Sequence, residues 1–380
     1  MEPINPDGCD YMQLTLHLTN QCNLKCKYCF VEPGPERMSR EVAFAAAELG
    51  MKNTNTSGLL FYGGEPLLEK QLIYDIVDYT KKINKKTGHI FYYKITTNGI
   101  LLDEEFLKFS RDNNLSMSFS HDGPAQDVCR IFHDNSGSFD ALAEKIPMLL
   151  KYQPYATGMC VIDPSTVHRA AEIVRFLFDA GFRYITCNMN YSEDAPWTEE
   201  LLAVLGNEYK KMADMYLNLT RAEEKFYLSP FDIKIMSHIK GDKYHTDRSR
   251  FAMNQPSVAP NGKIYTLSRH LNNPAFEIGS VFSGIDFAKH NLIYEKGAST
   301  PVTCEECAIK SRCNYVYDIL SFDGNDYIPD ISPVQCANEQ ILTPIADGVA
   351  QKLFDEKNAL FIHKHYNELY PLVSFVEDNG

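Results

Sequence analysis

Three cysteines close together near the N-terminus constrain this chain more than any other feature. Cys22, Cys26 and Cys29 are spaced C-x3-C-x2-C in one short loop that follows an apolar run. Soft thiolates packed this closely suit zinc or an iron–sulfur cluster. Three ligands are one short of a closed structural site, and an open position is typical of a catalytic metal. A zinc site with a distant fourth ligand and a set of buried free thiols are the alternatives.

A glycine pair follows the next apolar run of the chain. Gly63-Gly64-Glu65-Pro66 comes directly after Leu59-Leu60-Phe61-Tyr62. Glycines let the backbone approach a ligand closely, and a neighbouring carboxylate can hold an ammonium group. This turn therefore favours a ligand-binding cluster over a plain zinc site or free thiols.

In this order and at this distance, the two motifs resemble the radical S-adenosylmethionine (radical SAM) superfamily. There, three cysteines hold three irons of a [4Fe-4S] cluster, and SAM chelates the fourth iron. The resemblance implies that Cys22, Cys26 and Cys29 are the cluster ligands. It also implies that one electron, from a flavodoxin-type or ferredoxin-type donor, cleaves SAM to a 5′-deoxyadenosyl radical that abstracts a substrate hydrogen atom.

The same resemblance implies further contacts to SAM. It places Tyr28 near the adenine, and Gly63, Gly64 and Glu65 at the methionine amine. Polar residues near later strand ends match the ribose and carboxylate contacts, namely Asn98, Ser120, Asp122 and Arg130. Short polar groups at a strand end also serve as turn caps, so this alternative stays open for Ser120 and Asp122. For Arg130 the alternative is a surface arginine on a helix.

Charge and cysteine usage exclude several classes of protein. The chain has 380 residues, enough for one large domain or two ordinary ones, and a net charge of −13 that argues against a nucleic-acid surface. Neither an export signal nor an apolar run of the ~20 residues that a membrane helix needs is visible. Eleven cysteines, an odd number and clustered, fit a reducing compartment. We therefore expect a cytoplasmic protein without a membrane partner.

Strand and helix patterns alternate six times in the first 220 residues. Apolar, β-rich runs at 14–18, 59–62, 91–96, 115–120, 158–162 and 184–189 are each followed by a segment of helical periodicity. Such alternation predicts an α/β fold with a parallel sheet. Six units instead of eight, with the motifs at strand C-terminal ends, predict a partial (βα)6 barrel over residues 10–220 whose active site lies on that face.

The C-terminal part carries a second set of cysteines. Residues 221–256 show no clear periodicity and are expected to be a linker, whereas 257–267 predict a β-hairpin with an Asn-Gly turn. Cys304, Cys307, Cys313 and Cys336 then complete an all-thiolate site, for which zinc and a [4Fe-4S] cluster both fit the spacing. This arrangement resembles the SPASM/twitch domain, which implies a second, auxiliary cluster in residues 257–345, before a helical tail at 346–380.

Two departures from a full SPASM domain bear on the substrate. No cysteine lies between Cys187 and Cys304, and Tyr317 stands where a further ligand is expected, so one of two auxiliary clusters is predicted to be lost. The stretch 263–271 also lacks the aspartate that sulfatase maturases carry, since Leu267 and Ser268 stand there. A base for the substrate radical would then come from His270, Arg269, Tyr265, Tyr315 or Tyr317.

Several functions are compatible with these features. The leading hypothesis is a radical SAM enzyme that abstracts hydrogen from a residue of a peptide or protein. Oxidation of a small molecule and anaerobic sulfatase maturation are the enzymatic alternatives, and a non-catalytic iron–sulfur or zinc protein is the third. The start of the chain close to the barrel predicts no leader-recognition domain. Cys160 and Cys187 are candidate hydrogen donors, although buried core thiols are commoner.

Overall fold

The computed structural model describes residues 11–52, 54–241, 255–298, 304–313, 320–329 and 332–370. Its main feature is a sheet whose strand order is β13-β12-β11-β10-β1-β3-β4-β5-β7-β8-β9. The six predicted strands are all confirmed as parallel neighbours within it, each at or slightly beyond the predicted ends. They are β1 (Tyr11–Thr19), β3 (Thr56–Gly63), β4 (Ile90–Thr97), β5 (Leu115–Ser120), β7 (Thr157–Ile162) and β8 (Tyr184–Met189).

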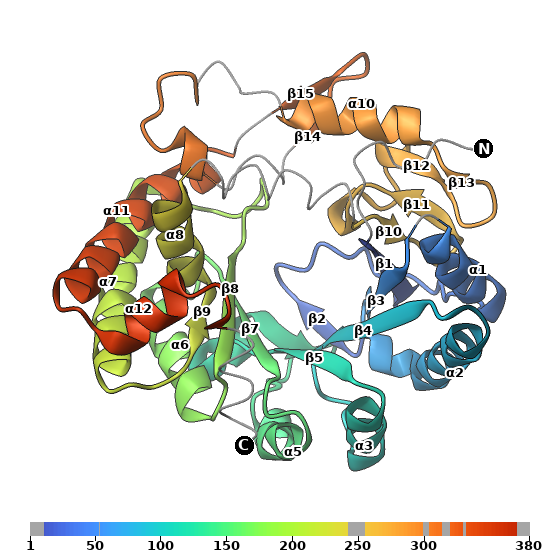
Figure 1. Ribbon diagram of the computed structural model, residues 1–380, viewed down its shortest axis with the longest axis horizontal. Coiled ribbons are helices and arrows are strands. Elements are labelled where there is room, and N and C mark those ends of the chain that lie inside the picture. Colours follow the sequence, from blue (N-terminus) through green and yellow to red (C-terminus); the bar gives the residue numbers. More distant parts are fainter. Residues whose placement is uncertain are drawn as a thin grey trace.

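These strands curve into an arc with helices on its outer side, as Figure 1 shows. The helices are α1 (Arg40–Met51), α2 (Lys70–Thr87), α3 (Glu104–Asp112), α5 (Lys145–Tyr152), α6 (Ala170–Asp179) and α7 (Glu199–Arg221). In β1, the fully buried Leu14, Leu16 and Leu18 alternate with the buried Thr15 and His17, so both faces of the strand are covered. The partial barrel predicted from the alternation is confirmed.

Local capping explains where several helices begin. The side chains of Ser39, Asp103 and Thr198 each accept a hydrogen bond from a backbone N–H in the first turn of α1, α3 and α7. Each cap contributes about 1 kcal/mol to helix stability. A 3₁₀ turn at Asp140–Leu142 precedes α5.

The segment predicted as a linker contains regular structure. Strand β9 (Tyr227–Leu228) pairs in parallel with β8, and helix α8 (Ser229–Lys240) follows it directly. The periodicity of α8 is weak because the helix is buried on several sides, with Phe231, Lys234 and Ile235 all inside. The region expected to be a linker, 221–256, therefore contains a strand and a helix at residues 227–240.

The predicted hairpin continues the barrel sheet. Strands β10 (Ser257–Val258) and β11 (Lys263–Tyr265) pair antiparallel across a turn in which Gly262 has φ +84, which confirms the prediction. Strand β10 also pairs in parallel with β1, so the sheet runs on from the barrel through the hairpin. Strands β12 (Glu277–Ser280) and β13 (Gly284–Ile285), helix α10 (Phe287–Ala298) and the pair β14 (Leu320–Phe322) and β15 (Tyr327–Pro329) complete this part.

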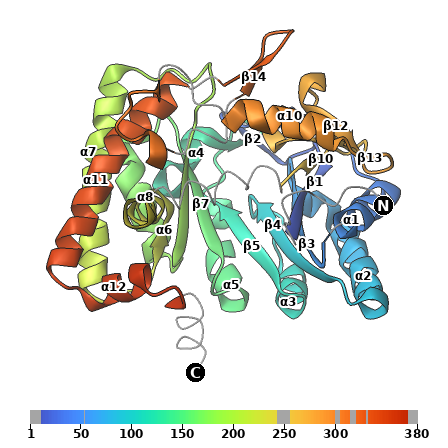
Figure 2. The ribbon, with the colours of Figure 1, turned by 45° about the horizontal axis from the view of Figure 1, so that its top comes forward.

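Two helices end the described chain, and residues 346–355 and 359–366 of the expected tail lie in them. Helix α11 (Pro333–Asp355) packs against α7 and α8, and α12 (Ala359–Tyr366) follows it (Figure 2). Because α11 runs through residue 345, the structure shows no break at the predicted border between auxiliary domain and tail. Within the described ranges, no helix combines the length and apolar character that crossing a membrane requires.

Candidate active site

A cavity of about 530 Å³ lies at the C-terminal ends of the strands, and the cysteine loop lines it. Cys22, Cys26 and Cys29 all contribute to its wall. The loop is held by a short antiparallel pair, β2 (Leu24–Cys26) with β6 (Arg130–Phe132), the latter directly after α4 (Gln126–Cys129). The three predicted cluster ligands therefore face one space, on a loop fixed by a second segment of the chain.

The surroundings of Cys22 suit an iron–sulfur ligand. The Leu24 backbone N–H lies 3.4 Å from its sulfur, and the Asn98 amide nitrogen lies 3.6 Å away. Burial raises the pKa of this thiol to about 12, and nearby anionic groups, including Glu65, add to the rise. N–H groups directed at sulfur stabilise the thiolate, the form that binds iron. In the described part of the chain, no three His, Cys, Asp or Glu side chains converge around a single metal ion.

The glycine turn lies directly on the cysteine loop. Gly64 N–H donates to the Thr19 carbonyl at 2.8 Å, and a Cβ at Gly64 would lie 2.2 Å from the Gln21 carbonyl oxygen. Gly63 has φ +132, and a Cβ there would lie 2.3 Å from Thr19 O. Only glycine fits these contacts, and both glycines line the cavity, as the sequence predicted for a close backbone approach.

Glu65 lies behind the cavity wall and does not line it. Its side chain is fully buried, and its carboxylate accepts hydrogen bonds from Leu67 N, Thr97 Oγ1 and Asn98 N at 2.7–2.9 Å. Burial raises the pKa of this carboxyl, while the three donors oppose the rise. Glu65 therefore fastens the end of β3 to the end of β4, and its contact with the SAM amine stays a prediction.

Tyr28, Asp122 and Arg130 form a polar network beside the cavity, in which Asp122 and Arg130 are buried and Tyr28 is half-buried. The Tyr28 hydroxyl donates to Asp122 and accepts from Arg130 Nη1 at 2.9 Å. Tyr28, Arg130 and Ser120 line the cavity, whereas Asp122 lies behind them and accepts from Val161 N at 2.9 Å. Burial raises the pKa of Asp122, and the Arg130 charge opposes it. Asp122 thus orients Tyr28, and its contact with a ribose stays a prediction.

Arg130 has one hydrogen-bond donor to spare. It lies on strand β6 and is buried, so the alternative of a surface helix arginine is wrong. Its Nε is buried and has no hydrogen-bond partner among the described residues. A guanidinium with an unused N–H at a cavity wall suits a carboxylate ligand, which agrees with the predicted contact to the SAM carboxylate.

The second set of cysteines also comes together. One pocket of about 20 Å³ is lined by all four auxiliary cysteines, Cys304, Cys307, Cys313 and Cys336. Cys336 lies on α11, and the other three lie in the segment 304–313. The Gln340 amide donates to Cys336 sulfur at 3.3 Å. Four thiols around one small space fit a fully cysteine-ligated cluster.

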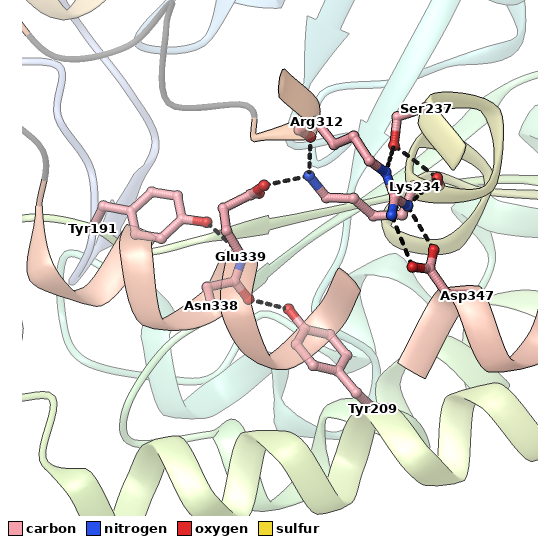
Figure 3. Close-up of polar contacts among 8 residues, drawn as sticks. All are labelled: Tyr191, Tyr209, Lys234, Ser237, Arg312, Asn338, Glu339 and Asp347. Atoms are coloured by element: carbon pink, nitrogen blue, oxygen red, sulfur yellow. Dashed lines mark hydrogen bonds and ion pairs between the residues drawn. The ribbon is translucent and has the colours of Figure 1, made fainter. Parts of the chain in front are cut away.

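The opposite wall of the cavity consists of residues that the sequence did not single out. Tyr191 follows β8, and the other polar side chains come from α7 and the two helices beyond it; they are Tyr209, Lys234, Gln335, Asn338 and Glu339. Figure 3 shows Asn338 between two tyrosines, accepting from Tyr209 at 2.7 Å and donating to Tyr191 at 3.0 Å. Gln335 Oε1 is buried and has no hydrogen-bond partner in the described ranges. The sequence signal that could have pointed to this wall is Lys234, a lysine between two isoleucines in a segment of helical length.

The remaining candidates differ in their access to the cavity. Cys187 lines it, and the buried Cys160 lies behind, with 3.4 Å between the two sulfurs on paired strands. Arg269 lines the cavity, whereas His270 is buried against Phe276, and burial lowers its pKa to about 4. Tyr315 and Tyr317 lie outside the described residues.

Comparison with known sequences finds a family match over the residues that carry the cysteine loop. Residues 16–177 match the Radical SAM superfamily. The cysteine-type anaerobic sulfatase-maturating enzyme of Clostridium novyi is 28% identical over 181 residues, 44% of this chain and 48% of the relative. The serine-type enzyme of Bacteroides thetaiotaomicron is 24% identical over 343 residues, 77% and 79% of the two chains. The chain thus spans about half the length of the first curated relatives that it matches.

Solved structures agree on the fold. The chain matches anSMEcpe with bound AdoMet and a Cp18Cys peptide with a TM-score of 0.72 and 17% identity, over 90% of this chain and 99% of that one. It matches Streptococcus suis SuiB bound to precursor peptide SuiA with a TM-score of 0.57 and 15% identity, over 85% and 75%. The chain therefore contains a radical SAM domain and is homologous to the anaerobic sulfatase-maturating enzymes.

Proposed function

We propose that this chain is a radical SAM enzyme that modifies a residue of a peptide or protein. Cys22, Cys26 and Cys29 would hold a [4Fe-4S] cluster that, with bound SAM, supplies a 5′-deoxyadenosyl radical able to take a substrate hydrogen atom. The observation that carries the proposal is the single cavity of about 530 Å³ that joins this cysteine loop to a polar wall from α7, α8 and α11.

Each of the two cavity walls would bind a different molecule. The glycine pair, Tyr28 and Arg130 lie beside the cysteines and would hold SAM, with Arg130 Nε free for its carboxylate. Asn338 and Gln335 lie on the other wall, where the unpartnered Gln335 oxygen suits an amide N–H of a peptide. This wall orients the substrate, and both walls exclude water. A flavodoxin-type or ferredoxin-type donor would supply the electron.

Sulfatase maturation is the second candidate, because the sulfatase-maturating enzymes are among the relatives found by sequence and by structure. Against it stand the missing aspartate at 263–271 and the absence of cysteines between Cys187 and Cys304. The auxiliary cysteines Cys304, Cys307, Cys313 and Cys336 would hold one further [4Fe-4S] cluster.

The test is an anaerobic assay of the reconstituted protein with SAM and dithionite. A sulfatase-motif peptide and any short peptide encoded beside the gene are offered separately, and products are identified by mass spectrometry. We expect a mass change on the neighbouring peptide. Formylglycine on the sulfatase peptide would establish the second candidate, and turnover of small metabolites alone would contradict the peptide proposal.

A further inference from the structure

Lys234 is a buried lysine with a single anionic partner in the described structure. Its side chain is 1% exposed and forms an ion pair with Glu339, whose side chain is 5% exposed. The ammonium also donates to the Arg312 carbonyl oxygen at 3.2 Å (Figure 3). Burying either charge alone would be costly, so each of the two buried groups stabilises the charged form of the other.

A second ion pair, between Arg312 and Asp347, fixes the position of the Arg312 carbonyl that Lys234 contacts. The Arg312 guanidinium holds both carboxylate oxygens of Asp347, at 2.8 and 2.5 Å, and donates to Ser237 Oγ at 3.3 Å. Arg312 directly precedes Cys313. These contacts tie one auxiliary cysteine to α8 and α11, the two helices that carry Lys234 and Glu339.

Glu339 belongs to two cavities at once. It lines the large cavity together with Lys234, and it lines the small pocket formed by the four auxiliary cysteines. On α11 it follows Cys336 by one helical turn, so both side chains lie on the same face. The Lys234–Glu339 pair is therefore a shared wall between the substrate cavity and the auxiliary site.

We propose that Lys234 sets the reduction potential of the auxiliary cluster by neutralising Glu339. This inference rests on the proposed function, which assigns a [4Fe-4S] cluster to the four auxiliary cysteines. A cluster with four thiolates is anionic, and an uncompensated carboxylate beside it would disfavour the extra electron of the reduced state. The ammonium cancels that charge at the wall facing the substrate. The higher potential makes the cluster a better acceptor for an electron from the cavity.

The test uses the full chain carrying Cys22→Ala, Cys26→Ala and Cys29→Ala, so that only the auxiliary cluster contributes. Its midpoint potential is measured by redox titration followed by electron paramagnetic resonance. In this background Lys234→Met should shift the potential to more negative values, and Glu339→Gln to more positive values. The double variant, which removes both charges, should return close to the parent.

The matched control is Arg221→Met, which breaks an exposed ion pair between the last residue of α7 and Glu356, the residue directly after α11; neither residue lines either pocket. It should leave the potential unchanged. If Lys234→Met does not fold, Glu339→Gln and the double variant still decide the sign. If the midpoint potential shifts in the same direction in both single variants, or does not shift, this inference is overturned while the auxiliary-cluster proposal stands. Absence of a cluster in the parent would overturn this inference and the auxiliary-cluster proposal together.

Discussion

Gly64 lies so close to the cysteine loop that its lack of a side chain decides the geometry of the site. A Cβ at this position would meet the Gln21 carbonyl oxygen at 2.2 Å and the Asn20 carbonyl oxygen at 3.0 Å. Both contacts are backbone atoms, which give way less readily than the end of a side chain. Any larger residue must therefore displace the loop that carries Cys22.

We expect Gly64→Ala to destabilise the fold by about 1–3 kcal/mol, as overpacking does in cores, and to lower the iron held at the first cluster. Gly348→Ala is the control, because no atom lies within 4 Å of a Cβ there and the position is inside α11. That variant should gain about 1 kcal/mol. Denaturant unfolding and iron analysis measure both effects, and equal iron content in the two variants would contradict the clash.

At the scale of elements, the junction of β1 with the hairpin depends on a neutral histidine. His17 in β1 is fully buried, bonds Ser268 Oγ at 3.0 Å and packs edge-on against Tyr62. Ser268 in turn lies 2.9 Å from Ser257 Oγ in β10. Burial lowers the pKa of His17 to about 3, so it stays uncharged at neutral pH.

Acid should therefore weaken this junction. Between pH 6.5 and the folded pKa of about 3, the unfolded chain binds a proton at His17 that the folded chain does not. Stability is thus lost as pH falls through this window, by up to about 1.4 kcal/mol per pH unit. His17→Phe keeps a ring but does not titrate, so its free energy of unfolding should fall less steeply between pH 6.5 and 4. Parallel pH profiles of the variant and the wild type would refute this.

Across the whole molecule, the features that could be predicted from the sequence are those encoded by residues close together in the chain. The barrel strands follow from apolar runs and are confirmed. The cysteine loop and the glycine turn follow from residue type and spacing; both line one cavity, and their contacts to a cluster and to SAM stay predictions. Helix α8 was missed because burial on several sides erases its periodicity. The polar wall was missed because Tyr209, Lys234 and Asn338 lie far apart in the chain and meet only through the packing of α7, α8 and α11.

Residue type alone could not show which groups of the chain two carboxylates contact. Glu65 and Asp122 stand at strand ends, where a ligand contact and a structural contact have the same sequence signature. The structure shows each carboxylate held by donors of the chain itself. Gly64, which precedes Glu65 in the chain, and Tyr28, which donates to Asp122, are the residues that line the cavity.

The proposed function requires that the whole chain cleave SAM through the first set of cysteines. The most direct measurement is 5′-deoxyadenosine formed per hour by reconstituted protein, SAM and dithionite under anaerobic conditions. The wild type should hold about eight irons, as two [4Fe-4S] clusters require, and should release 5′-deoxyadenosine. The variant with Cys22, Cys26 and Cys29 all changed to alanine should lose about half of the iron and all of the product. Continued release of 5′-deoxyadenosine by that variant would contradict the account.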